Sequence, residues 1–125
     1  MFAVGSGGII LRSDRSTWNV QASGTTQPLN AVWGTSANDV YAVGAGGTIL
    51  HYDGTSWTPQ NSGSTQALFA VWGGAGNSVF AVGDASTILH YDGTKWSAQT
   101  TSADMTLRGV WGSSPTNVFA VGTPR

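Results

Sequence analysis

The chain has 125 residues, with six acidic side chains, five basic side chains and no cysteine. A formal charge of −1 creates no field that would attract nucleic acid or an anionic membrane, so neither is expected as a partner. The lack of cysteine excludes disulfides and thiolate metal sites. No apolar run could span a bilayer, and the first 14 residues lack a signal-peptide pattern. The sequence predicts a soluble chain and leaves its compartment open.

The most informative feature of the sequence is a repeat of 39 residues. The segment LNAVWGTSANDVYAVGAGGTILHYDGTSW aligns without a gap with LFAVWGGAGNSVFAVGDASTILHYDGTKW. All six tryptophans fall on two series at this spacing, Trp33, Trp72 and Trp111 in one and Trp18, Trp57 and Trp96 in the other. Self-similarity at such a period is typical of repeat architectures.

Each complete copy contains four short segments rich in β-branched and aromatic residues, separated by turn residues. In the copy at 29–63 these segments lie at 29–33, 40–43, 48–52 and 57–60. The copy at 68–102 repeats them. Residues 1–24 hold only the second, third and fourth segments, and residues 107–122 hold only the first and second. We therefore expect one unit over 1–125, with two complete copies between two partial ones.

Four strands in about 40 residues, repeated along a chain, are typical of a β-propeller blade. The segments LNAVWG and DVYAVG are apolar without alternation, which indicates strands buried on both faces between neighbouring blades. The fourth segment is polar after its tryptophan, so we place it at the outer edge and the first segment at the central channel. The predicted fold class is all-β: a β-propeller of four-stranded antiparallel blades, with three blade equivalents per chain.

The two tryptophan series receive different predictions. Trp33, Trp72 and Trp111 lie in the first segment, and we expect them to pack between blades. Trp18, Trp57 and Trp96 begin the polar fourth segment, so we expect them to lie less deep. An aromatic ring beside small polar groups suits a sugar, which makes this second series the candidate for ligand binding.

The residues VWGTSANDVYAVGAGGTILHYDGTSW resemble the repeats of bacterial multi-bladed β-propellers, including long repeat proteins of myxobacteria. The hairpin YDGTSW is similar to a shortened Asp-box turn of sialidase-like propellers, in which the Asp and the Trp stand further apart. The first copy departs from this pattern, because LRSDRSTW carries Arg12, Ser13 and Arg15 where the other copies have His, Tyr and Gly. The resemblance covers nearly the whole chain and implies the propeller fold, without implying a ligand.

The repeat is out of phase with the ends of the chain. Three periods leave eight residues over, and the strand FAVG at 2–5 recurs at 119–122. Met1 occupies the position of Val40, Val79 and Val118, which favours a piece excised or engineered from a longer array.

Three blades leave two apolar end faces uncovered, and head-to-tail contact between copies would close a ring. Two copies give six blades, inside the usual range of about four to eight, so we expect a homodimer. A trimer or another strand-swapped form is the alternative. The strand of Phe2 and Val4 and the strand of Phe119 and Val121 are candidates for the same position in the shared blade.

Asp14, Asp53 and Asp92 share one position in the predicted hairpin turns. An Asp in a turn accepts hydrogen bonds from nearby backbone N–H groups, and we expect that structural role here. One carboxylate per turn supplies too few oxygens for calcium. His51 and His90 also share a position, but a zinc or catalytic role would need further ligands, so no metal site is predicted.

No catalytic residue is predicted. The sequence has no nucleophile motif, no unique carboxylate pair for glycoside hydrolysis, and no glycine-rich loop that opens a helix. We expect a non-enzymatic propeller without cofactors, acting as a structural or interaction scaffold that assembles into a closed ring. The alternative is a lectin-like propeller that binds a glycan.

Overall fold

A computed structural model describes residues 1–14, 16–75, 78–99, 101 and 104–124. Within these residues the regular elements are thirteen strands and two short 3₁₀ turns. The strands pair only with antiparallel neighbours and form four sheets. The described residues contain no helix long and apolar enough to cross a membrane.

Two of the sheets are complete and have the same strand order. The first contains β4 (Leu29–Ser36), β5 (Asp39–Gly44), β6 (Ile49–Tyr52) and β7 (Trp57–Gln60). The second contains β8 (Leu68–Ala75), β9 (Ser78–Gly83), β10 (Ile88–Tyr91) and β11 (Trp96–Gln99). Their registers agree at repeat-equivalent positions, with Trp33 opposite Tyr41 and Trp72 opposite Phe80. These sheets are the four-stranded antiparallel blades that the sequence predicts.

The other two sheets are partial blades. One contains β1 (Phe2–Val4), β2 (Ile10–Ser13) and β3 (Trp18–Gln21). By repeat position β1 corresponds to β5, so this sheet lacks the strand that corresponds to β4. The other contains β12 (Met105–Ser114) and β13 (Asn117–Pro124), which correspond to β4 and β5. The strand position of β5 is therefore filled at both ends of the chain, by β1 and by β13.

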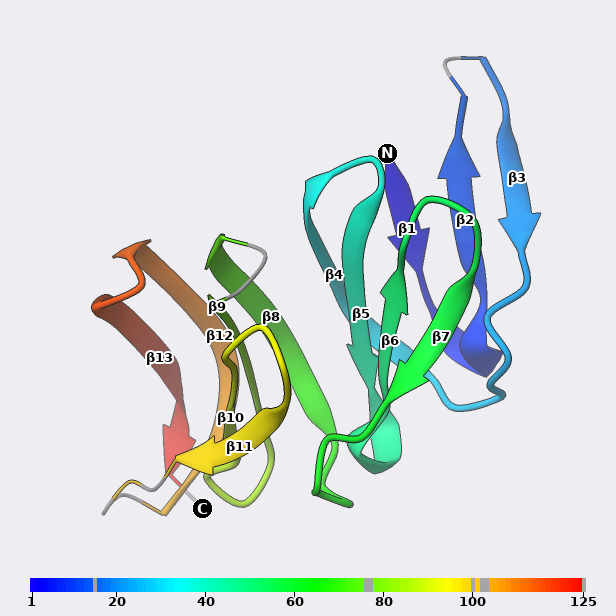
Figure 1. The fold of residues 1–125 in the computed structure, drawn as a ribbon. Helices are drawn as coiled ribbons and strands as arrows, with labels where there is room; N and C mark the ends of the chain where they lie inside the picture. Colours follow the sequence, from blue (N-terminus) through cyan, green and yellow to red (C-terminus); the bar gives the residue numbers. More distant parts are fainter. Residues whose placement is uncertain (15, 76–77, 100, 102–103, 125) are drawn as a thin grey trace.

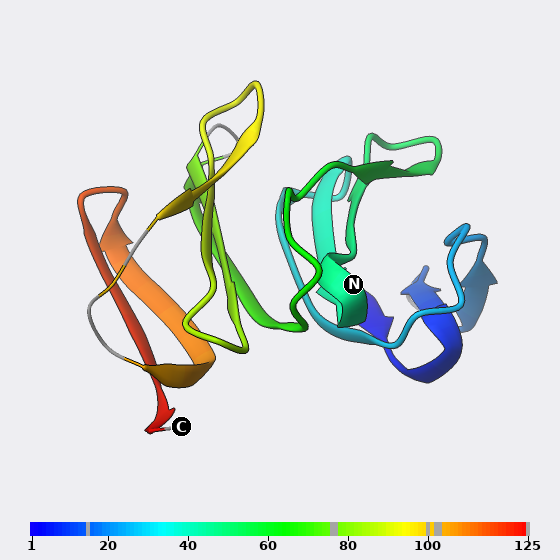
Figure 2. The same cartoon turned by 90° about the horizontal axis from the view of Figure 1, so that it is seen from below.

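The four sheets lie side by side in chain order, as both ribbon views show (Figures 1 and 2). β4 packs beside β8, and β8 packs beside β12. Each complete blade consequently has a neighbour on both sides, whereas each partial blade has a neighbour on one side.

Among the described residues, two apolar clusters form much of the core, one in each of the first two spaces between sheets. Along β5, Val40 and Ala42 belong to the cluster shared with β1–β3. Tyr41 and Val43 belong to the cluster shared with the next blade. Since successive side chains of a strand point to opposite faces, this division explains why the strand is apolar at every position from Val40 to Val43.

The turn between the second and third strands of a blade differs between copies. In the blade of β4–β7 it is the 3₁₀ turn Ala45–Gly47, with φ of 68° at Gly46 and 74° at Gly47. In the next blade Ala85 and Ser86 replace these glycines with φ of 53° and 59°. A left-handed backbone costs a residue with a Cβ about 1–2 kcal/mol. The Ser86 N–H donates to the Met105 carbonyl oxygen at 2.7 Å, which ties this turn to β12.

Candidate functional site

The tryptophans of the first strands contact the next blade. A Cβ built on Gly73 would lie 2.5 Å from Cη2 of Trp33, and one built on Gly112 would lie 2.8 Å from Cη2 of Trp72. Each ring thus lies directly over a glycine that follows the tryptophan of the neighbouring blade. Any larger residue there would displace the ring, so the Trp–Gly pair defines the contact between consecutive blades.

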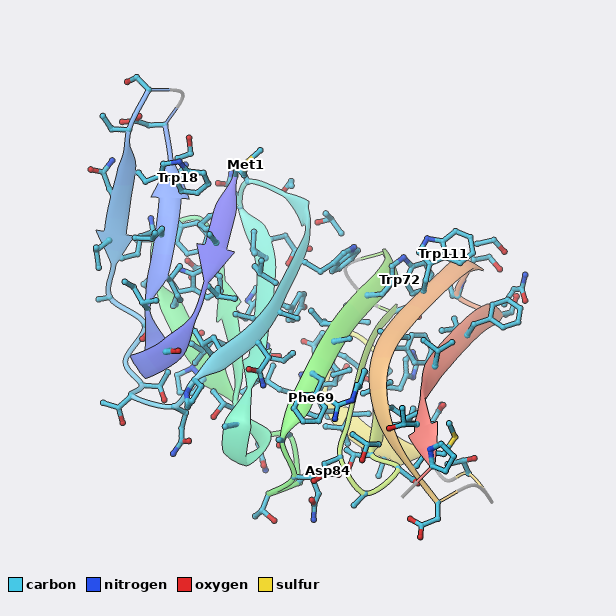
Figure 3. All side chains as sticks on the ribbon, turned by 180° about the vertical axis from the view of Figure 1, so that it is seen from behind. Met1, Trp18, Phe69, Trp72, Asp84 and Trp111 are labelled. Carbon is cyan, nitrogen blue, oxygen red and sulfur yellow. The ribbon has the colours of Figure 1, made fainter. Side chains whose placement is uncertain are left out.

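The third member of this series has no following blade within the chain. Trp111 leaves 62% of its surface exposed. Figure 3 shows its side chain beyond Trp72, on the side of the molecule opposite Met1 and Trp18. At the other end of the series, the heavy atoms nearest to a Cβ built on Gly34 belong to Asp39 and Val40 of its own blade.

A pocket of about 360 Å³ opens at Gly34. It lies between the first partial blade and the blade of β4–β7, at the position where Trp33 and Trp72 pack in the two later spaces. Its lining combines apolar and polar side chains, and it consists of Met1, Phe2, Val32, Trp33, Gly34, Thr35, Ser36, Ala37 and Val40.

The tryptophans of the fourth strands lie deeper than the sequence suggests. Trp57 and Trp96 are each only 7% exposed, whereas Trp33 and Trp72 are half-buried. The expectation that Trp57 and Trp96 form the shallower set is wrong. Trp18 is the exception, at 48% exposure.

Burial of Trp57 results from side chains of its own blade and of the preceding one. Its ring lies 5.2 Å from that of Tyr52 and 5.6 Å from that of Phe2, measured between centroids. Its indole N–H donates to Oε1 of Gln21 at 2.8 Å. In the next blade the Trp96 indole donates to Oε1 of Gln60 at 2.7 Å.

The glutamine partners were not identified as site residues from sequence, although a signal was present. Gln21, Gln60 and Gln99 recur at the same 39-residue spacing as the tryptophans. The first two are half-buried beneath an indole, and Gln99 is exposed. A periodic polar residue one blade before a periodic tryptophan therefore marks an interblade hydrogen bond.

Two further pockets lie beside these bonds at equivalent repeat positions. One has a volume of about 270 Å³ and is lined by Gln21, Ala22, Tyr52, Thr55, Ser56 and Trp57. The other has a volume of about 350 Å³ and is lined by Gln60, Asn61, Tyr91, Thr94, Lys95 and Trp96. Their hydroxyl and amide groups can hydrogen-bond a polar ligand, while the tryptophans offer little free ring face.

The three periodic aspartates accept hydrogen bonds within their own turns. Oδ1 of Asp53 accepts from the N–H groups of Thr55 at 2.8 Å and Ser56 at 3.0 Å. Asp92 and Asp14 make the equivalent pairs of bonds. Because these bonds favour the carboxylate, they hold the pKa of all three groups below the ordinary value of 3.8.

The residues at the repeat position of the histidines have three different partners. His51 Nε2 lies 2.7 Å from Oδ1 of Asp39, and His90 Nε2 lies 3.1 Å from Oγ of Ser78. In the first copy Arg12 donates to the Tyr52 hydroxyl at 3.2 Å. Across the described part of the chain, no group of three His, Cys, Asp or Glu residues could hold a metal ion.

The two copies of the duplicated strand differ in burial. Phe2 and Val4 are half-buried and pack against the first core cluster. Phe119 and Val121 are 59% and 63% exposed. The same FAV sequence is thus held in place at the start of the chain and uncovered at its end.

Four-stranded antiparallel sheets packed face to face in chain order define this fold as a β-propeller. The chain matches no protein-family model and no curated protein. Among solved structures it is similar to YCF48 bound to D1 peptide, with a TM-score of 0.76, 16% identity, and coverage of 94% of this chain and 42% of the other. It is also similar to YCF48 from Cyanidioschyzon merolae, with a TM-score of 0.74, 13% identity, and coverage of 98% of this chain and 47% of the other.

This likeness supports the predicted fold class, and the chain spans less than half the length of the two solved chains. The closer resemblance to Asp-box and myxobacterial repeats stays a prediction.

Proposed function

We propose that this chain is a non-enzymatic propeller scaffold that acts through its blade faces, and that the 125-residue chain closes a ring with a second copy. The observation that carries the proposal is the apolar surface at the two ends of the row of sheets. Large apolar side chains are exposed on both partial blades: Met1, Ile9, Trp18 and Val20 on the first, and Trp111, Phe119 and Val121 on the last. Surfaces of this kind are typical of interaction sites.

A head-to-tail arrangement covers both end faces with one type of contact. Two copies supply six blade equivalents, which is within the usual range of propellers. We therefore propose a homodimer, with a trimer or another strand-swapped form as the alternative ring.

The test is the mass in solution, measured by light scattering after size-exclusion chromatography over a range of concentrations. A mass twice that of the 12.9 kDa chain supports the proposed dimer. A mass three times that of the chain supports a ring of another size. A 12.9 kDa species at every concentration contradicts self-association.

A glycan is the second candidate ligand, supported by the two equivalent pockets beside Trp57 and Trp96. Each provides a tyrosine, a threonine and a glutamine within one small concave surface. Such groups suit the hydroxyls of a sugar. Because both indoles are nearly covered, we place recognition on the polar groups rather than on ring stacking.

A glycan array with the native chain tests this candidate. The matched variants are Thr55→Ala with Thr94→Ala, which change both pockets, and Thr58→Ala, which changes an exposed position of β7. Saturable binding that the pocket variant loses and the Thr58 variant keeps supports a lectin-like role. Absence of binding on the array, or equal binding by all three proteins, contradicts it.

A further inference from the structure

We propose that the second copy joins by strand exchange, in which β12 leaves β13 and pairs with β1 of the other copy. Trp111 of the first copy then packs on Gly34 of the second, and Trp18 of the second donates to Gln99 of the first. This inference rests on the self-association proposed above, and it specifies the surfaces that make the contact. Three separate repeat-equivalent contacts lead to it.

The first contact is the Trp–Gly pair. Trp33 covers Gly73 and Trp72 covers Gly112, one blade apart in each case. Continuing the series by one blade places Trp111 over the glycine that corresponds to Gly34 in a following unit. Gly34 is the remaining glycine of the series, and the pocket of about 360 Å³ beside it is open. The exposed ring and the open pocket are thus the two halves of a contact that the chain already makes twice.

The second contact is the indole hydrogen bond. Trp57 donates to Gln21 and Trp96 donates to Gln60, in both cases from one blade to the preceding one. Continuing this series pairs Gln99 with the tryptophan of a following blade, which by repeat position is Trp18 of a second copy. Gln99 and Trp18 are both exposed. Placing Trp111 on Gly34 brings together the same two faces, because Gln99 and Trp111 lie at one end of the row of sheets and Trp18 and Gly34 lie at the other.

The third contact lies between the first and second strands of a blade, and it identifies the pairing strand. A Cβ on Gly44, Gly83 or Gly122 would clash with a backbone carbonyl oxygen at the start of the adjacent first strand. For Gly122 that oxygen belongs to Thr106 of β12. Gly5 holds the same repeat position after β1, yet a Cβ there meets only Cγ2 of Ile9, at an ordinary 3.4 Å. The edge of β1 therefore has room for a first strand, and β12 is the strand of that type at the other end of the chain.

Burial decides which copy of the duplicated strand is displaced. The Phe2 ring lies 5.5 Å from Tyr52 and 5.6 Å from Trp57, and the Gly5 carbonyl oxygen accepts from the Leu29 N–H at 3.0 Å. Removing β1 would disrupt this packing. Phe119 and Val121 are exposed, so removing β13 breaks its ladder with β12 and the bond from Asn117 Nδ2 to Ser113 Oγ, and residues 1–5 of the other copy can take the ladder positions of residues 118–122.

The test uses two glycine variants of the full chain. Gly5→Ala should leave the isolated fold unchanged, because its Cβ has space, but it blocks the approach of Thr106 of a second copy. Gly122→Ala is the matched control, because its Cβ clashes with Thr106 only while β13 stays on β12. We expect Gly5→Ala to lose the dimer with an unchanged far-UV circular dichroism spectrum, and Gly122→Ala to keep it.

A mixing experiment tests the direction of the contact. Trp111→Ala removes the exposed indole ring and keeps Gly5 and Gly34. Gly5→Ala keeps the ring and blocks the edge of β1 that receives β12. Each variant alone should be monomeric by light scattering. An equimolar mixture should form a dimer through one intact contact, made by Trp111 of the Gly5→Ala variant and the β1 side of the Trp111→Ala variant.

The possible outcomes distinguish the strand exchange from the self-association on which it rests. A native chain that is monomeric at every concentration contradicts both. A native oligomer that survives Gly5→Ala and Trp111→Ala leaves self-association standing and overturns the exchange. Loss of the oligomer in Gly122→Ala and its retention in Gly5→Ala overturn it as well, because β1 would then be the displaced strand. A mixture that stays monomeric contradicts the pairing of Trp111 with the β1 side.

Discussion

The two complete blades and the two partial blades carry tryptophans at equivalent positions, but these tryptophans have different surroundings. Trp57 and Trp96 are 7% exposed, whereas Trp18 is 48% exposed. Trp72 lies over a glycine of the next blade, whereas Trp111 has no following blade in the chain and is 62% exposed. The comparison teaches that burial in this fold is a property of the space between two blades rather than of a position within one blade.

The largest difference in stability is expected among the tryptophans of the fourth strands, Trp18, Trp57 and Trp96. Trp57→Ala should lower the free energy of unfolding by about 3–5 kcal/mol, because it leaves a cavity between blades and an unpaired Gln21. Trp18→Ala should lower it by less than about 1 kcal/mol. Urea denaturation in the Gly5→Ala background, where both proteins are expected to be monomeric, measures the two values. Equal losses would show that the interblade space does not determine burial.

A smaller difference in stability is expected among the tryptophans of the first strands, Trp33, Trp72 and Trp111. Trp72→Ala should cost about 2 kcal/mol, since its half-buried ring packs on Gly112, and Trp111→Ala should cost less than about 1 kcal/mol. The same denaturation experiment applies, with thermal melting as a second measure. An unchanged melting temperature for Trp72→Ala would contradict the packing role assigned to the tryptophans of the first strands.

The third comparison concerns the turns of the two complete blades. Ala85→Gly should stabilise the protein by about 1 kcal/mol, because glycine relieves the left-handed backbone at φ 53°. Gly46→Ala, at the equivalent position, should destabilise by about 1–2 kcal/mol, since its Cβ would make only ordinary van der Waals contact with Gln27 and only the backbone is strained. Changes of the same sign in the two variants would refute the equivalence of the turns.

The smallest expected effect is the pH dependence contributed by the aspartate turns. The folded-state pKa of Asp53 is lowered by N–H donors from Ser56 and Thr55, so its contribution to stability is present above pH 3.8 and is lost as the pH falls through the folded value. Asp53→Asn keeps an acceptor oxygen but cannot titrate. It should therefore flatten the decline in stability between pH 4 and lower pH, as measured by urea midpoints. An Asp53 carboxyl that titrates at or above 3.8 in an NMR experiment would contradict the role of the turn.

Sequence periodicity predicts the strands well, because the inner strands are apolar on both faces and the strands end at residues that favour turns. The predicted segment at 57–60 coincides with β7, and the one at 29–33 is three residues shorter than β4. The depth of Trp57 could not be predicted in this way. It starts a polar strand, and its cover comes from Phe2 and Gln21, which belong to another blade.

The pocket at Gly34 was equally invisible in the sequence, for a related reason. The same repeat position is occupied by Gly34, Gly73 and Gly112. They differ only in whether a tryptophan from a preceding blade lies over them. Periodicity identifies the residues of a contact, while the arrangement of the sheets determines which contacts are occupied.

The Trp–Gln bond that joins each blade to the one before it also bears on how such a chain can lengthen. Both partners are encoded in every 39-residue unit, so a tandem duplication of one unit supplies a donor for the preceding glutamine and an acceptor for the following indole. This bond therefore needs no compensating substitution when a unit is inserted between two others. A single duplication or deletion of one 39-residue unit preserves the bond at every junction between blades.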